Sequence, residues 1–184
     1  MWRERSGREG IDIAAVRSDM SGLPFADESF DLVISISALA YAKDIAPVFR
    51  DVQRVLKRGG QFVFQCFLAE TLTPPRILRE VAASFGLKLT DPNTTLGSEE
   101  RCRAAVSAAG MVCSSVTMDT WIEDIAQPRG LNLEASLLSH AFSALDAERL
   151  RSLEERYVKE LDRVRISLHG KDRQAVLLVS GQRP

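Results

Sequence analysis

The chain has 184 residues, of which 45% are hydrophobic and 27% are charged. A chain of this length and composition can bury a real core, and we expect residues 1–184 to form a single globular domain. The formal net charge of −1 provides no basic surface for nucleic acid, and no apolar run is long enough to span a bilayer.

The three cysteines, Cys66, Cys102 and Cys113, are odd in number and form no Cys-x-x-Cys pair. They therefore indicate neither a disulfide framework nor a zinc site, and no other metal-ligand cluster or catalytic triad stands out. The polar N-terminus does not resemble a signal peptide. Free thiols without a leader predict a cytoplasmic protein.

Two apolar segments in the first fifth of the chain are predicted to be strands. Residues 11–16 are short and partly β-branched, whereas residues 30–37 form a nearly continuous apolar run, which is typical of a strand covered on both faces. Turn-forming residues fill the connection at positions 22–29.

The clearest helical pattern covers residues 44–58, where apolar side chains recur at the i, i+3, i+4 spacing of one helix face. Asp44 is suited to cap the first turn, and Gly59 is predicted to end the helix. A further strand is expected at residues 61–67.

The rest of the chain alternates helices and strands. The predicted elements are a helix from Thr73 to Gly86, a helix from Ser98 to Gly110, a strand at 111–118, a helix within 131–142, a long helix from Asp146 whose apolar stripe ends at Val164, and a strand at 174–180.

Several short motifs occur together in this framework. They are Asp19-Met20, Leu23-Pro24-Phe25, Ser29-Phe30-Asp31-Leu32-Val33, Tyr41, Asp44, Arg54-Val55-Leu56-Lys57-Arg58-Gly59-Gly60, Ser98-Glu99-Glu100 and Ala109-Gly110-Met111. In combination they resemble class I S-adenosylmethionine-dependent methyltransferases. The resemblance is strongest to the small-molecule group that includes the ubiquinone/menaquinone and malonyl-carrier-protein methyltransferases.

The resemblance implies an α/β, Rossmann-like sheet with helices on both faces and an antiparallel last strand. Two parts of the family pattern are not found: the Gly-rich loop after its first strand and the acidic residue that ends its second strand. Gly7 and Gly10 do not follow a strand, so they do not supply that loop. The sequence therefore resembles a partial, N-terminally truncated domain without the first two strands, about 30 residues or more.

Losing those strands would leave the edge of the strand at residues 30–37 without a partner, and such an apolar edge favours self-association. We expect residues 11–16 to pair with this strand or to remain unpaired.

The resemblance also implies S-adenosyl-L-methionine as cofactor. Asp19 would accept a hydrogen bond from the adenine amino group, the Met20 backbone would contact the ring, and Leu23 would flank it. Ser35, Ile36 and Ser37 would pass beside the methionine half of the cofactor. The competing interpretation is that Asp19 is a turn residue and that the serines are merely small strand residues.

Tyr41 and Phe67 would face the substrate, and Trp121 is a candidate for lining the substrate cavity, although all three are equally typical of core positions. The family often has histidine where this chain has Ala40, which weakens one expected substrate contact. The acceptor-specific region of such enzymes corresponds here to a variable helical region at about residues 120–165.

The implied reaction is methyl transfer to a small-molecule acceptor, without nucleic acid or a membrane as partner. It would depend mainly on placing the acceptor in line with an already electrophilic methyl group, so no catalytic residue is assigned. Without the Gly-rich loop, we expect the chain to bind the cofactor weakly or not at all. The alternative function is a catalytically inactive Rossmann-like protein-interaction module; a nucleotide-binding oxidoreductase is less consistent with residues 54–60.

Overall fold

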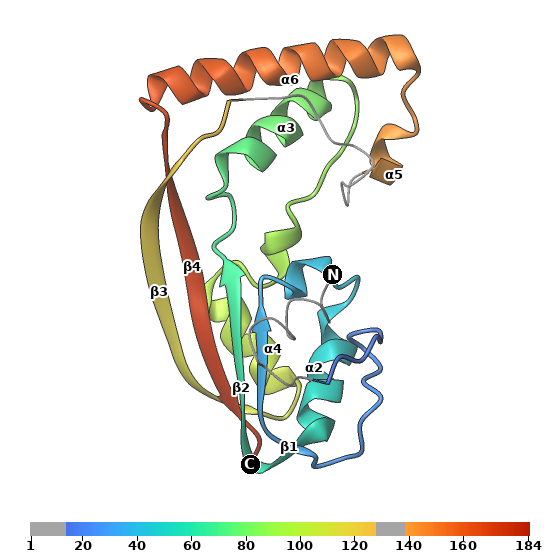
Figure 1. The fold of residues 1–184 in the computed structure, drawn as a ribbon, viewed down its shortest axis with the longest axis vertical. Coiled ribbons are helices and arrows are strands. Elements are labelled where there is room, and N and C mark those ends of the chain that lie inside the picture. The colour runs from blue at the N-terminus through green and yellow to red at the C-terminus, as the bar shows by residue number, and fades with distance from the viewer. Residues whose placement is uncertain (1–13, 128–138) are drawn as a thin grey trace.

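A computed structural model describes residues 14–127 and 139–184, which contain one open sheet with helices around it (Figure 1). The strands are β1 (Phe30–Ile36), β2 (Leu56–Phe67), β3 (Val112–Asp124) and β4 (Lys171–Gln182). The helices are α2 (Ile45–Val55), α3 (Thr73–Ser84), α4 (Glu99–Ala108), α5 (Ser139–Phe142) and α6 (Ala147–Ser167), with short 3-10 turns at η1 (Leu39–Tyr41) and η2 (Pro92–Thr95).

The sheet has the strand order β1-β2-β4-β3. β1 and β2 run parallel and are joined through α2, whereas β4 is antiparallel to both β2 and β3. The predicted α/β sheet with an antiparallel last strand is therefore confirmed. Helix α6 lies at one end of the molecule beside α3, well away from α2 and α4 (Figure 1).

The strand predicted at residues 11–16 is not present in its described part. Residues 14–16 have no strand pairing and are exposed, while residues 11–13 lie outside the described residues. Within residues 14–127 and 139–184, β2 is the only strand that pairs with β1. The other edge of β1 therefore has no partner in this part of the chain, as one of our two expectations for it stated.

The helix predicted at residues 44–58 is correct in its face and its start but not in its end. Asp44 Oδ1 accepts the Ala46 backbone N–H at 2.9 Å, as expected for the cap. The helix ends at Val55, because the fully buried Leu56 is already extended and pairs with Phe30 of β1. Gly59 lies in the resulting bulge with φ of +77° instead of ending the helix.

The later predictions are also largely correct. Ser98 and Asp146 cap α4 and α6 through the backbone N–H groups of Arg101 and Arg149. β3 is longer than predicted and continues to Asp124, so the first residues of the expected variable helical region are in a strand. Of the helix expected within 131–142, residues 131–138 lie outside the described residues, and α5 covers 139–142.

The main core lies where α2 and α4 pack on one face of the sheet. Phe49 of α2 and Phe62 and Phe64 of β2 are 0–1% exposed, and their ring centroids are 5.0–5.3 Å apart. Aromatic packing of this kind gives the core much of its buried apolar area. A second core joins α3 to α6 through residues such as Ile77, Leu153 and Tyr157.

Burial along β4 shows how helices come to cover both faces of the sheet. Leu177 and Val179 are buried in the core with α2 and α4. On the opposite face, Asp172 and Gln174 are buried, and Asp172 accepts hydrogen bonds from the backbone and hydroxyl of Thr73 at the start of α3. The two helical layers therefore cover opposite faces at opposite ends of the strand, as the expected helices on both faces require.

One part of the sheet remains uncovered by the described residues. Leu32, Ile34 and Ile36 of β1 are 47%, 60% and 62% exposed, and Leu178 lies in the same cross-strand row as Ile36. None of the helices in the described part of the chain has the length and apolar character needed to cross a membrane.

Candidate functional site

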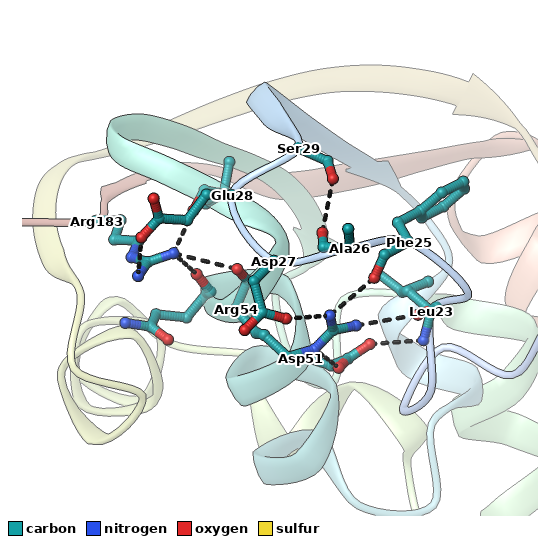
Figure 2. Close-up of polar contacts among 11 residues, drawn as sticks. Leu23, Phe25, Ala26, Asp27, Glu28, Ser29, Asp51, Arg54 and Arg183 are labelled. Atoms are coloured by element: carbon teal, nitrogen blue, oxygen red, sulfur yellow. Dashed lines mark hydrogen bonds and ion pairs between the residues drawn. The ribbon is translucent and has the colours of Figure 1, made fainter.

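The loop that precedes β1 is held by one arginine of α2. The Arg54 guanidinium donates to the carbonyl oxygens of Leu23 and Phe25 at 3.0 and 2.8 Å, and to Asp27 Oδ1 at 2.7 Å (Figure 2). Its Nε donates to Asp51 Oδ1 at 2.7 Å. Since Arg54 has a planar fork of donors, one side chain can fix several points of the loop at once.

Asp51 completes this arrangement from the preceding turn of α2. Its Oδ2 accepts the Leu23 backbone N–H at 2.6 Å, so Leu23 is bound through both its N–H and its carbonyl group. The side chain of Asp51 is only 13% exposed. The hydrogen bond from Arg54, followed by that from Leu23, lowers the pKa of the Asp51 carboxyl group despite its burial.

A second arginine, from the end of the chain, secures the C-terminal end of α2. Arg183 donates to the carbonyl oxygens of Gln53 and Arg54 at 3.2 and 3.1 Å and also contacts that of Leu56. It pairs in addition with Glu28 at 2.9 Å (Figure 2). A cation at these carbonyl groups satisfies acceptors that a helix end leaves free.

Asp19, the predicted adenine contact, lies on the surface before a turn. Its Oδ1 accepts both the backbone N–H and the hydroxyl group of Ser21, at 2.8 and 2.6 Å. These two bonds lower the pKa of Asp19, so the side chain is an ionised acceptor at neutral pH. Oδ2 takes part in neither bond and is placed to accept a further donor.

Two adjoining cavities connect the predicted site residues. Asp19 and Met20 line one of about 310 Å³, and Ser37 and Phe67 line another of about 200 Å³. Tyr41, in the 3-10 turn η1, contributes to both walls. The structure therefore places these five predicted residues in the walls of two cavities that share Tyr41.

The remaining predicted residues are not in the walls of these two cavities. Leu23 is in the loop held by Arg54, where its backbone is bound, and Ser35 and Ile36 are within β1. Trp121 lies on β3 with its ring centroid 6.3 Å from that of Phe67. It is a neighbour of the smaller cavity through Phe67 rather than part of its wall.

The smaller cavity contains a polar pair made of the predicted residue Ser37 and of Gln65, which the sequence did not reveal as functional. Ser37 has φ of +50°, which is uncommon for a residue other than glycine, and its hydroxyl group donates to Gln65 Oε1 at 2.7 Å. Gln65 is 9% exposed, although its neighbours in β2 are apolar. The sequence feature that could have identified Gln65 is its position as a polar residue within an otherwise apolar strand segment. Asn93 adds another uncharged polar side chain to this cavity, and none of the described residues that line it is charged.

The known proteins to which this chain is similar include methyltransferases. Residues 1–64 match the family described as Methyltransferase domain. A sterol methyltransferase-like protein from Botryococcus braunii is 33% identical over 89 residues, covering 46% of this chain and 23% of its own length. Cycloartenol-C-24-methyltransferase 1 from Oryza sativa is 27% identical over 168 residues, covering 86% of this chain and 45% of its own.

The fold is similar to that of a candidate methyltransferase from Bacillus halodurans. The TM-score is 0.53 at 15% identity, and the match covers 91% of this chain and 70% of the other. The fold is thus that of the Rossmann-like methyltransferases. Residues 1–64 are similar to the methyltransferase domain family, and the matched stretches of the chain are similar to sterol methyltransferases. It spans less than half the length of the two curated relatives named above.

Proposed function

We propose that this chain is part of an S-adenosylmethionine-dependent methyltransferase. The loop at Asp19 and the end of β1 at Ser37 would contact the cofactor, and the cavity beside Phe67 would hold the methyl acceptor. The observation that supports this most is the shared wall at Tyr41, because the cavity beside Asp19 and the cavity beside Ser37 meet there. In open α/β sheets, ligands bind outside the carboxyl ends of the parallel strands, and both cavities lie at that edge.

The residues present suit the adenine end of the cofactor. The exposed Asp19 carboxylate offers Oδ2 to the adenine amino group, while Ser21 holds its other oxygen. The backbone of Met20 and the loop edge at Leu23 would contact the ring. Arg54 and Asp51 would not contact the cofactor themselves. They hold the backbone of Leu23, in the loop that carries these groups.

The methionine end would follow β1 to its tip. Ser35, Ile36 and Ser37 occupy the end of this strand, and the left-handed backbone of Ser37 turns the chain toward η1. A rare backbone conformation at the end of a strand is often kept for a functional reason. The cofactor would then lie along the Tyr41 wall between the two cavities.

The methyl acceptor is proposed to be a small molecule that enters the cavity of about 200 Å³. Its lining is apolar except for Ser37, Gln65, Asn93, Tyr41 and Thr95. A wall without charged side chains disfavours the burial of a charged group. The acceptor should therefore present an uncharged part to this cavity, near Phe67, with Trp121 behind it.

When bound, the cofactor supplies an electrophilic methyl group, and the residues of the chain hold the methyl acceptor in the orientation for transfer. A wall that orients the acceptor and excludes water is sufficient for in-line transfer, so the proposed role of Gln65 and Ser37 is to orient an acceptor polar atom. The described residues contain no Gly-rich loop for the middle of the cofactor. We therefore expect weak binding, with a Kd above about 10 µM.

Titration of the ¹⁵N-labelled chain with S-adenosylhomocysteine and S-adenosylmethionine tests this proposal. We expect saturable shifts, and Asp19→Ala should weaken binding about tenfold by removing a charged acceptor. Asp119→Ala is the matched control, since Asp119 is also exposed and accepts a backbone N–H. Absence of shifts at millimolar ligand, or equal affinities of the two variants, would contradict the proposal.

A second candidate function is a protein-interaction module that acts through the edge of β1. On this strand Leu32, Ile34 and Ile36 are exposed, and its one charged residue, Asp31, is paired with Lys57, whereas the opposite edge strand, β3, carries acidic residues near its end. Edges with few charges favour pairing with another strand, and we propose a second copy of this chain as the partner.

Sedimentation velocity over a range of concentrations tests this alternative. We expect a concentration-dependent dimer that Ile34→Lys abolishes, while Ile122→Lys on β3 leaves it unchanged. A monomer at every concentration, or the same behaviour in both variants, would contradict it. The three free thiols also favour a reducing compartment, and we propose a cytoplasmic location on this basis.

A further inference from the structure

Two cysteines from distant parts of the chain meet inside the main core. Cys66 of β2 and Cys102 of α4 are 36 positions apart in sequence, yet their sulfur atoms are 3.7 Å apart. They are 8% and 0% exposed. The third cysteine, Cys113, is on β3 and contacts Arg103 instead.

The smaller cavity gives this pair a route to solvent. Cys66 is part of the cavity wall beside Phe67, whereas Cys102 does not line it. Both sulfur atoms also contact the carbonyl oxygen of Leu96, at 3.4 and 2.8 Å. Because Leu96 is itself in the cavity wall, its carbonyl group keeps the two thiols side by side just behind that wall.

We propose that Cys66 and Cys102 form an oxidisable dithiol site, which a small peroxide entering the cavity converts to a disulfide. The Cys66 thiolate attacks one peroxide oxygen, the O–O bond breaks, and the departing hydroxide takes up a proton to leave as water. The Cys102 sulfur then attacks the resulting sulfenic acid, an S–S bond forms, and the hydroxyl group leaves with the Cys102 proton as a second water. Two thiols are oxidised, and one peroxide is reduced to two waters.

The geometry assigns different roles to the two sulfur atoms. Cys66 is the one that a solute in the cavity can reach, and Cys102 is the resolving partner behind it. The contact between the sulfur atoms lowers the pKa of the Cys66 thiol, and the same contact together with burial raises that of Cys102. The sulfur atoms, now at 3.7 Å, must approach by about 1.7 Å to reach the ~2.05 Å of a disulfide.

The disulfide would change the wall of the proposed acceptor cavity. It ties β2 to α4 and draws the Cys66 sulfur toward Cys102, which does not line the cavity. Gln65 and Phe67 flank Cys66 in the chain, so the polar pair and the aromatic wall lie next to the new bond. The site itself does not depend on the methyltransferase assignment, because only the cavity and the two thiols are needed.

The test is to treat the folded chain with hydrogen peroxide, block free thiols with iodoacetamide, and map the cysteines in tryptic peptides. Trypsin cuts after Arg101 and Arg103, which separates Cys102 from Cys113. We expect a peptide pair joined through Cys66 and Cys102, lighter by two hydrogen atoms and separated by dithiothreitol, while Cys113 is alkylated. Free Cys66 and Cys102, oxidation of Cys66 without a crosslink, or a dominant crosslink to Cys113 would overturn the proposal.

The same oxidation in urea is the control, because it shows which pair of cysteines crosslinks when the chain is unfolded. Cys102 and Cys113 are only 11 positions apart, so loop closure favours their pairing once the fold is lost. We expect the preferred crosslink to change from Cys66–Cys102 in the folded chain to Cys102–Cys113 in urea. An unchanged preference for one pair in both conditions would show that the fold does not select the pair.

Two variants separate the roles of the sulfur atoms. Cys102→Ala should leave Cys66 as a sulfenic acid that dimedone traps, and Cys113→Ser should leave the Cys66–Cys102 crosslink intact. Failure of Cys66 to react with dimedone in folded Cys102→Ala would contradict its assignment as the attacking sulfur. Should Cys102→Ala not fold, mapping of the wild-type chain still decides the proposal.

Discussion

Two carboxylates in the first third of the chain, Asp51 and Asp19, differ in burial and in hydrogen-bond partners. Asp51 belongs to the scaffold, whereas Asp19 belongs to the proposed cofactor site. Asp51 is largely buried and is bound to Arg54 and to the backbone of Leu23. Asp19 is exposed, and within the described residues its carboxylate accepts hydrogen bonds from Ser21 of its own turn. Hydrogen bonds lower the pKa of both groups, so both are ionised at neutral pH.

The difference indicates which charges serve the fold and which remain for a ligand. Both carboxylate oxygens of Asp51 have a partner: Oδ1 accepts from Arg54 of the same helix, and Oδ2 accepts from the Leu23 backbone, so its charge is used in positioning the loop. Asp19 leaves Oδ2 available toward the cavity that it lines with Tyr41. If this interpretation is right, changes around Asp51 should affect stability first, and changes at Asp19 should affect ligand binding alone.

The largest effect is expected for Arg54→Ala. The substitution removes the donors to the Leu23 and Phe25 carbonyl groups and leaves Asp51 without its cation. We expect the melting temperature to fall by roughly 5–10 °C and the ligand-induced shifts at Asp19 to be lost with the loop. Differential scanning fluorimetry measures the first, and Arg50→Ala, an exposed position of the same helix, should change it little.

Arg183→Ala should have the next largest effect. The side chain is 16% exposed and covers the last carbonyl groups of α2. Losing these bonds and the pair with Glu28 should lower the free energy of unfolding by about 1–3 kcal/mol in urea denaturation. Arg173→Ala, an exposed position of β4, the strand that Arg183 follows, is the control; an equal loss in both variants would show that the α2 contacts are not responsible.

The pH dependence of stability tests Asp51 directly. Because its folded-state pKa is below the unfolded value of about 3.9, its contribution is present above that pH and is lost as pH falls through the folded pKa. The urea midpoint of Asp51→Asn should therefore be lower than wild type at pH 7, and the gap should narrow below about pH 4. The exposed Glu100→Gln should show no such gap, and a gap independent of pH would contradict the assignment.

The smallest effect on the fold is expected at Asp19. Asp19→Ala removes bonds only to Ser21 in its own turn, so its melting temperature should match that of wild type within error. Its loss of cofactor affinity would then come from the missing acceptor alone. A clear drop in melting temperature would mean that Asp19 supports the fold and is a turn residue after all.

The sequence predicted the features that depend on nearby residues. The apolar face of α2 and the caps at Asp44, Ser98 and Asp146 follow from short patterns, whereas the antiparallel direction of β4 was implied by the family resemblance. The early end of α2 did not, because the extension of Leu56 comes from its pairing with Phe30 in another element.

The residues of the candidate site were predicted only in part, because several of its contacts also join residues that are far apart in the sequence. Motif resemblance identified Asp19 and Tyr41, which the structure brings to adjoining cavities. It did not identify Arg54 as the residue that holds the loop, because its partners on that loop lie 27–31 positions away. Gln65 was overlooked because its importance comes from its bond to Ser37, 28 positions away.

The central claim is that one cofactor molecule contacts both the loop at Asp19 and the carboxyl end of β1. Hydrogen–deuterium exchange of the chain with and without saturating S-adenosylhomocysteine tests it most directly. We predict slower exchange in peptides covering residues 17–22 and residues 34–41 together, and no change in β3. Protection of only one of these two segments, or of neither, would contradict the account.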